Sequence, residues 1–467
     1  MLRIIATTCV LGLLASPTAM AGQADLILVG AKVLTGDSNR PAAEAVALAG
    51  ERIRAVGPSA EIRRLAGPRT RVVDLRGRTV IAGLIDAHVH LLAGPGIVDE
   101  PSLRNFERTA LPEIMIGFIS HGITTVRSTG DPLPYIAQLR DRLERGQLVG
   151  PRLLITGPAP SSPGGHPATT VCRDNPFCRQ GIAREIESEE QARQVVRELS
   201  RAKVDAVKLV VDDFYGKVPR LSDAVISALV DETHRAGLRI IAHVSVTKDV
   251  AIARRLIELG VDEFAHLFVS NRDGGHFALA PINELTLPNP AEVSQIAGLL
   301  VARNIPVTTT VSNGDGYRDT TGVERIQFGG SPPYTPAMRQ RLEWALNTVR
   351  EFADAGVKLV LGTDAVSPPP SNSVVREDPR LQPGARTLHE MELLHRAGLP
   401  TPAVLTAATR NAAEALRIID KVGTIVEGKL ADLVILDGDF LQDFSALHRT
   451  VAVLKGGRVV HGALPER

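Results

Sequence analysis

The sequence predicts an α/β protein built around a (β/α)8 TIM barrel. Eight short apolar runs with strand-like composition follow one another along the middle of the chain, and segments with helical spacing and length separate them. Strands that alternate with helices of this size form a parallel sheet, because each crossover helix covers one face of that sheet. Five of the runs also end in residues of the types that bind metal ions, and a barrel would gather those residues at one end.

The barrel elements follow in order along the chain. The eight predicted strands comprise residues 84–90, 123–128, 152–157, 204–210, 238–243, 261–266, 306–311 and 357–363. The predicted helices comprise residues 132–145, 189–201, 223–236, 247–259, 291–303 and 336–355. A bare barrel needs about 250 residues, so this chain of 467 residues with 44% apolar content has material for a further domain.

The first strand ends in a His-x-His pair, His88 and His90. Residues i and i+2 of a strand point to the same face, so both imidazoles can bind one metal ion from the same side. Such a pair alone is equally compatible with two structural histidines. The later strand ends strengthen the metal interpretation, because they supply Lys208, His243, His266 and Asp364.

With these residues in place, the chain resembles the metal-dependent amidohydrolase superfamily. That superfamily carries His-x-His on strand one, a carboxylated lysine on strand four, histidines on strands five and six, and an aspartate on strand eight. The phrases at residues 83–90, 121–127 and 406–416 resemble its imidazolonepropionase-like and Xaa-Pro dipeptidase-like branch. The resemblance covers essentially the whole mature chain. It implies a ligand set comprising His88, His90, Lys208, His243, His266 and Asp364.

Lys208 favours two metal ions over one. An ammonium group does not bind a cation, but a lysine that has reacted with CO2 offers two anionic oxygens, which can span two divalent ions about 3.5–4 Å apart. The alternative is an ordinary lysine at a strand end, and Lys203 and Lys217 are nearby rivals. Imidazole and carboxylate ligands suit zinc best, with manganese or cobalt as alternatives. The expected mechanism uses a metal-bridging hydroxide, with Asp364 moving its proton to the leaving group.

Both ends of the chain lie outside the barrel, which is expected over residues 83–420. Short strand-like runs occur at residues 24–34, 45–56, 71–75, 428–436 and 451–460. The resemblance places them in one small discontinuous β-sandwich domain, made of residues 22–82 and 421–467. Residues 1–21 have the basic start, short apolar stretch and Ala-Met-Ala ending of a signal peptide cleaved after Ala21. A periplasmic or secreted protein is therefore expected.

The loop after the third strand contains further candidate residues. Cys172 and Cys178 are the two cysteines of the mature chain, and an exported protein permits a disulfide between them, with two free thiols as the alternative. His166 follows two glycines and is a candidate for binding or polarising the substrate carbonyl, although a loop histidine without that role fits equally well. Arg127 and Tyr215 are weaker candidates for substrate contacts, with an internal ion pair and simple packing as their alternatives.

The charge balance of 53 basic and 52 acidic residues gives no indication of nucleic acid or anionic membrane partners. A small-molecule substrate is expected, and a homo-oligomer is compatible with the sequence. The leading functional hypothesis is hydrolysis of an amide bond in an Xaa-Pro-like dipeptide or an N-acyl amino acid. The alternatives are a hydrolase of a cyclic amide, lactone or organophosphate ester, and a secreted metal or ligand binder without catalysis. Fold and metal site do not choose between the substrates.

Overall fold

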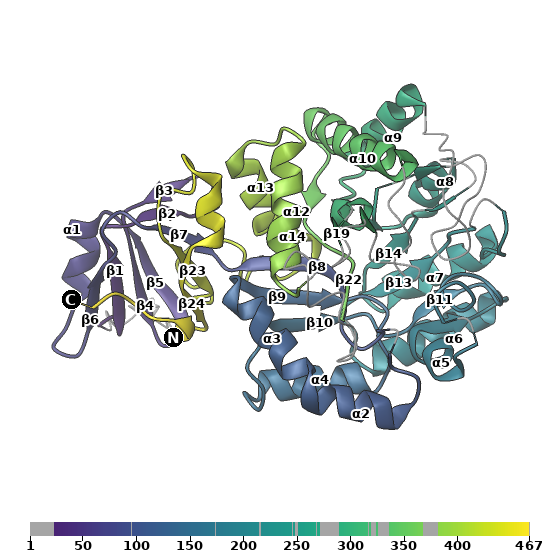
Figure 1. The fold of residues 1–467 in the computed structure, drawn as a ribbon, viewed down its shortest axis with the longest axis horizontal. Helices are drawn as coiled ribbons and strands as arrows, with labels where there is room; N and C mark the ends of the chain where they lie inside the picture. The colour runs from purple at the N-terminus through teal and green to yellow at the C-terminus, as the bar shows by residue number, and fades with distance from the viewer. Residues whose placement is uncertain are drawn as a thin grey trace, which may run out of the picture.

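The computed structural model places a small two-sheet domain beside a larger α/β domain (Figure 1). It describes residues 23–94, 96–172, 174–213, 216–244, 246–247, 251–267, 269–270, 289–315, 317–318, 324–325, 336–367 and 382–466. The expected signal peptide and Tyr215 therefore lie outside the described residues. In the part of the chain that is described, no helix combines the length and apolar character needed to cross a membrane.

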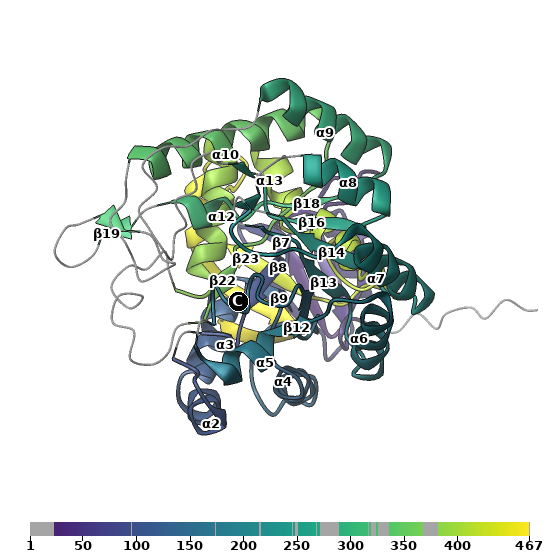
Figure 2. The same cartoon turned by 90° about the vertical axis from the view of Figure 1, so that its right-hand side faces the viewer.

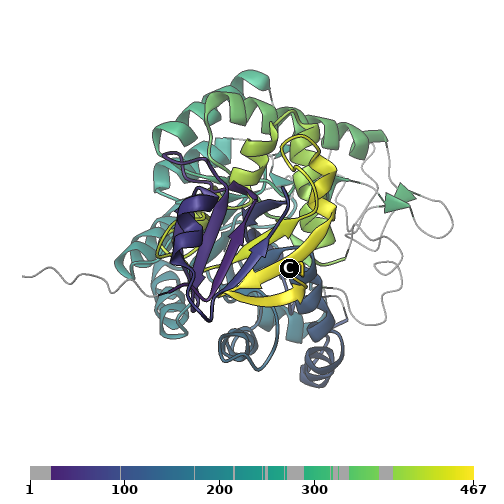
Figure 3. The ribbon, with the colours of Figure 1, turned by 90° about the vertical axis from the view of Figure 1, so that its left-hand side faces the viewer.

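The small domain is built from both ends of the chain, as the adjacent purple and yellow strands in Figure 3 show. One sheet has the order β5-β4-β1-β6, with β1 Leu26–Val29, β4 Ala45–Ala49, β5 Arg52–Gly57 and β6 Arg71–Asp74. The other has the order β25-β24-β23-β7-β2-β3, with β2 Lys32–Leu34, β3 Ala42–Ala43, β7 Thr79–Ala82, β23 Leu433–Leu436, β24 Thr450–Lys455 and β25 Arg458–Gly462. The antiparallel pairing of β7 with β23 joins the two chain ends. Apolar side chains from both sheets form one buried core, including Leu28, Val46, Val80 and Leu454. The short helices α1 (Ser59–Ile62) and η1 (Arg63–Leu65) lie between β5 and β6, and η4 (Phe444–His448) lies between β23 and β24.

The larger domain contains two parallel sheets that together make the barrel. One has the order β10-β9-β8-β22, with β8 Leu84–His90, β9 Ile123–Ser128, β10 Arg152–Ile155 and β22 Ala365–Val366. The other has the order β13-β14-β16-β18-β21, with β13 Val207–Val210, β14 Ile240–His243, β16 Glu263–Ala265, β18 Val307–Thr308 and β21 Leu359–Val360.

Backbone hydrogen bonds join these sheets at both seams. Ala87 donates to the Leu361 carbonyl at 3.0 Å, and Asp205 donates to the Ile155 carbonyl at 2.8 Å. The chain therefore has the predicted TIM barrel fold.

Helices surround the barrel strands, as the view in Figure 2 shows. Those expected from the sequence are α4 Tyr135–Glu144, α6 Glu189–Arg201, α7 Asp223–Arg235, α8 Ala251–Leu259, α9 Pro290–Ala302 and α10 Pro336–Ala355. Side-chain caps fix several starts: Ser188 forms a capping box with Gln191, and Ser222 caps α7. Their buried apolar faces pack against the strands in one continuous core.

Several elements were not among those expected. They are the helices α2 Glu100–Thr109, α3 Leu111–Ser120, α5 Pro176–Ile182, α12 Ala385–Arg396, α13 Thr401–Ala407 and α14 Arg410–Ala415, the 3-10 helix η2 Val311–Gly314, and the short strands β11 Ala159–Ser161, β12 Ala183–Glu185, β15 Val246–Thr247, β17 Val269–Ser270, β19 Tyr317–Arg318 and β20 Glu324–Arg325. Most of them lie in the connections that follow barrel strands, where function-bearing loops of this fold occur.

The long connection after β10 contains the two cysteines of the mature chain. The structure joins Cys172 and Cys178 in a disulfide, with Cα atoms 5.4 Å apart, which is the pairing that the sequence favoured. Asn175 caps α5 inside this ring through a hydrogen bond from the Cys178 backbone amide. The disulfide and the cap together restrain one turn of the connection.

Candidate metal centre

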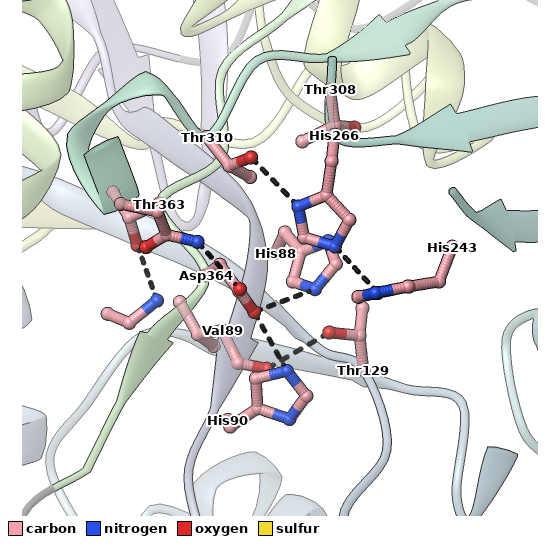
Figure 4. Close-up of polar contacts among 12 residues, drawn as sticks. His88, Val89, His90, Thr129, His243, His266, Thr308, Thr310, Thr363 and Asp364 are labelled. Carbon is pink, nitrogen blue, oxygen red and sulfur yellow. Dashed lines mark hydrogen bonds and ion pairs between the residues drawn. The ribbon is translucent and has the colours of Figure 1, made fainter. Parts of the chain in front are cut away.

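The carboxyl ends of the barrel strands bring the His-x-His pair into contact with Asp364 (Figure 4). His88 Nε2 lies 3.2 Å from Asp364 Oδ1, and His90 Nε2 lies 3.0 Å from the same oxygen. Every residue of β8 from Leu84 to Val89 is buried, including His88, whereas the last residue of the strand, His90, is half-buried. The strand pairing of β22 with β8 fixes this register, with Val366 opposite His90.

The other three expected ligands join the same cluster. Lys208 Nζ lies 2.9 Å from His88 Nε2 and donates to the Thr129 carbonyl at 3.2 Å. The ring of His266 lies 4.7 Å from the ring of His88 between centroids, and its Nε2 lies 2.8 Å from His243 Nδ1. The structure thus brings together all six residues that the sequence indicated, although they come from five different strands.

The backbone is specialised at the strand ends that carry these residues. Asp364 and His266 both have positive φ angles, +52° and +83°. Residues other than glycine rarely adopt this region, and such strain is common at functional sites. Hydrogen bonds hold both turns, since Asp364 N donates to the His88 carbonyl at 2.8 Å and His266 N donates to the Thr308 carbonyl at 3.0 Å. Gly362 permits the close approach, because a Cβ there would lie 2.8 Å from His88 Cβ.

Burial sets the protonation states of the cluster. It lowers the pKa values of His88 and His266 well below the ordinary range, so both rings are neutral and carry lone pairs. Burial also lowers the pKa of Lys208 to about 8, which raises the fraction of neutral amine. Burial alone would raise the pKa of Asp364, but His266, His88 and His90 outweigh it and hold that pKa well below its usual value.

This donor set fits divalent metal ions. One donor atom from each of His88, His266 and Asp364 lies within 4.8 Å of the other two, and one from each of His166, Asp212 and His243 forms a second such group. Neutral imidazoles and an ionised carboxylate are the ligands that zinc prefers. Metal binding also requires deprotonated ligands, which the lowered pKa values of His88, His266 and Asp364 provide.

Comparison with known sequences assigns the family. The sequence profile of the amidohydrolase family matches residues 79–460. The chain belongs to the amidohydrolase family. This amidohydrolase is therefore an enzyme that hydrolyses carbon–nitrogen bonds, and the family typically depends on metal ions.

Two of the relatives match most of the chain, and a third matches a short segment. This amidohydrolase is 25% identical to an imidazolonepropionase from Brevibacillus brevis over 412 residues, which cover 84% of this chain and 82% of the relative. A match with 43% identity to an N-substituted formamide deformylase from Arthrobacter pascens spans 72 residues, or 15% of this chain and 13% of that protein. A prolidase solved in complex with N-methylphosphonate-L-proline is 25% identical with a TM-score of 0.70, covering 94% of this chain and all of that one.

Two polar residues that contact the candidate ligands, Asp212 and Thr310, were not predicted from the sequence. In this amidohydrolase, Asp212 Oδ2 lies 3.1 Å from His243 Nε2, and Thr310 Oγ1 lies 2.8 Å from His266 Nδ1. Each contact engages the ring nitrogen that faces away from the other histidine, which fixes the orientation of both rings. Asp212 could have been predicted as a neighbour of the site, because it follows Lys208 by four residues at the same strand end.

The expected substrate contacts have different environments. The ring of His166 lies beside the cluster of candidate ligands, 5.0 Å from the His243 ring between centroids, and its Nδ1 contacts Thr170 Oγ1. Arg127, in contrast, is buried in a two-bond ion pair with Glu263 and also donates to the Ala87 carbonyl at 2.9 Å. Arg127 therefore has the internal ion pair that was the alternative to a substrate contact.

Proposed function

We propose that this chain is an exported binuclear metal hydrolase that cleaves the amide bond of an Xaa-Pro-like dipeptide or an N-acyl amino acid. The observation that carries the proposal is the contact of one carboxylate, Asp364, with both histidines of the His-x-His pair. This contact lies beside a buried lysine and a second pair of histidines. Such an arrangement supplies both metal ligands and a proton carrier at one place.

The residues divide between two ions. His88, His90 and Asp364 would hold one ion, His243 and His266 the other, and Lys208 would serve both after reacting with CO2. The neutral amine is the form that attacks CO2, so the low pKa of Lys208 favours formation of the carbamate. When bound, the metal ions polarise the scissile carbonyl and lower the pKa of the attacking water.

Asp364 would move the proton. Its pKa is held well below the usual value, so it is ionised at neutral pH and can accept a proton from the attacking water. The same carboxyl group then gives that proton to the departing amine, which restores the carboxylate. His166 is placed beside His243 on the rim of the cluster, where it would bind the substrate carbonyl.

The substrate class draws on the relatives. The prolidase of similar fold was solved with a proline-containing phosphonate, which supports a dipeptide or an N-acyl amino acid. The imidazolonepropionase similarity, which extends over most of both chains, favours cyclic amides as a second candidate. Lactones and organophosphate esters are further alternatives, because the same site chemistry applies to them.

Metal analysis combined with a substrate panel tests the proposal. The chain purified after export should contain close to two divalent ions, most of them zinc, and His88→Ala or Lys208→Ala should reduce that number. It should hydrolyse members of a panel of Xaa-Pro dipeptides and N-acyl amino acids, with cyclic amides, lactones and phosphotriesters assayed in parallel. One tightly bound ion that survives Lys208→Ala would contradict the binuclear centre. Turnover confined to cyclic amides would select the second candidate, and two bound ions without turnover of any panel member would contradict the proposed substrate classes.

The cellular location has its own measurement. Residues 1–21 are proposed to direct export, with cleavage after Ala21. The mass of the protein recovered from the periplasm or medium should correspond to a chain that begins at Gly22. A full-length protein retained in the cytoplasm would contradict export.

A further inference from the structure

We propose that Asn313 and Arg386 form a buried relay that positions the Asp364 carboxylate. The inference rests on the proposed function in one respect, because it takes Asp364 as a metal ligand. It assigns a role to two residues that supply no ligand themselves. Both lie outside the six residues of the expected ligand set.

Asn313 contacts the second oxygen of Asp364. Its amide nitrogen donates to Asp364 Oδ2 at 2.7 Å, while Oδ1 of the same carboxylate contacts His88 and His90. Asn313 therefore holds one oxygen of the carboxylate and the two histidines contact the other. The hydrogen bond at Oδ2 keeps Oδ1 directed at His88 and His90.

Arg386 fixes the orientation of the Asn313 amide. Its Nη2 donates to Asn313 Oδ1 at 2.6 Å. A guanidinium has only donors, so it selects the amide oxygen and leaves the NH2 group facing Asp364. Without Arg386, the amide could rotate and present its oxygen to the carboxylate, which would repel it.

The burial of Arg386 is unfavourable for folding. Arg386 is 1% exposed, and within the described part of the chain its Nε and Nη1 atoms are buried without a hydrogen-bond partner. Desolvating a guanidinium with two unused nitrogens is unfavourable for stability. Local features that disfavour folding are typical of functional sites.

The same helix also fixes the backbone that carries Asn313. Glu390 lies one turn after Arg386 on α12, so both side chains occupy the same helix face. Its carboxylate accepts hydrogen bonds from the backbone amides of Val311 and Ser312 at 2.8 and 2.7 Å. Helix α12 thus holds η2 by its backbone and Asn313 by its amide.

Zinc affinity of the apoprotein tests the relay without a substrate. Asn313→Ala, Arg386→Met and the double variant would be compared with the wild type by competition with a chromophoric zinc chelator. Loss of such supporting contacts typically weakens metal binding about 10- to 100-fold. We expect a loss in this range for Asn313→Ala. Because Arg386 acts through Asn313, the double variant should bind zinc no more weakly than Asn313→Ala alone.

Ser312→Ala is the matched control, since its hydroxyl lies in the same turn, is buried and makes no hydrogen bond within the described residues. It should keep the wild-type zinc affinity, and circular dichroism should show that every variant compared is folded.

If Arg386→Met does not fold, the comparison of Asn313→Ala with Ser312→Ala still decides the test. Wild-type zinc affinity in Asn313→Ala, or fully additive losses in the double variant, would overturn the relay. Asp364→Ala distinguishes failure of the relay from failure of the proposed metal centre. If this variant also leaves zinc affinity unchanged, the metal centre is contradicted together with the relay.

Discussion

At the scale of single residues, the proposed mechanism gives Asp364 two tasks that use different properties of its side chain. As a ligand it needs an oxygen directed at His88 and His90, and as a proton carrier it needs the basicity of a carboxylate. Asparagine retains an oxygen but has no basicity in the neutral range. Substitution by asparagine therefore separates the two tasks.

We expect Asp364→Asn to lose turnover more completely than it loses metal. Removal of a general acid–base group lowers kcat about 10²- to 10⁴-fold. The measurement is kcat and metal content on the same preparation, using a substrate found in the panel. His166→Ala is the contrast, because it should alter substrate handling while both ions remain bound. An Asp364→Asn enzyme that kept more than about a tenth of the wild-type kcat would exclude Asp364 as the proton carrier.

The sequence indicated the ligands better than their surroundings. Each of the six candidate ligands lies at or near the end of a strand-like run, and parallel strands of a barrel converge at that end. Spacing therefore predicted that they lie together, whereas the family resemblance implied their role as ligands. Asn313 and Arg386 contact the site from η2 and from α12, where no strand periodicity marks them. Arg127 carried the right charge at a strand end, but its partner Glu263 lies 136 positions later, a pairing that only the fold reveals.

At the scale of elements, the strands were predicted more accurately near the start of the barrel than near its end. Strands β8 and β9 have the expected bounds, whereas β18 and β21 comprise two residues each. For β18 the difference has a physical origin, because Thr310, two residues after the strand, leaves the extended conformation with a positive φ angle. The pattern of apolar residues does not predict where the backbone adopts a positive φ angle. Helices α6 and α10, with long amphipathic repeats, have the expected bounds.

The contact between β24 and the barrel should depend on pH through Lys455. Its Nζ donates to the Gly150 carbonyl at 2.6 Å, and burial together with Arg152 lowers its pKa from 10.5 to about 8, although Asp432 opposes this. The protonated form is therefore less favourable in the folded state than in the unfolded state. Lys455 contributes a stability that is present above pH 10.5 and is lost as pH falls through about 8.

Lys455→Met keeps the apolar stem and removes this dependence. Between pH 8 and 10.5, the free energy of unfolding of the wild type should rise relative to that of the variant, by at most about 3 kcal/mol. Urea unfolding of both proteins at several pH values measures the difference. Lys421→Met, which removes an exposed lysine, is the control. A difference between wild type and Lys455→Met that does not change with pH would refute the buried-lysine account.

At the scale of the whole molecule, the candidate metal centre lies across both sheets of the barrel. His88 and His90 belong to the sheet that contains β8, whereas Lys208 and His243 belong to the sheet that contains β13 and β14. Metal ions bound to all of them would connect the two sheets at the end opposite the small domain. Such ions would then contribute to global stability as well as to catalysis, since the unfolded chain does not hold these residues together.

Zinc should therefore stabilise the folded protein, and the effect should require ligands from both sheets. A site filled at a free zinc concentration of one hundred times its Kd adds about 2.7 kcal/mol to the free energy of unfolding. Urea unfolding of metal-free protein with and without buffered zinc measures the gain. His88→Ala and His243→Ala each remove a ligand from one sheet, and both should reduce it. His234→Ala removes an exposed histidine that pairs with Asp262 outside the cluster, and it should keep the full gain. Equal stabilisation by zinc in the wild type and in both ligand variants would place the bound zinc elsewhere on the molecule, and the connection between the sheets would then not depend on this centre.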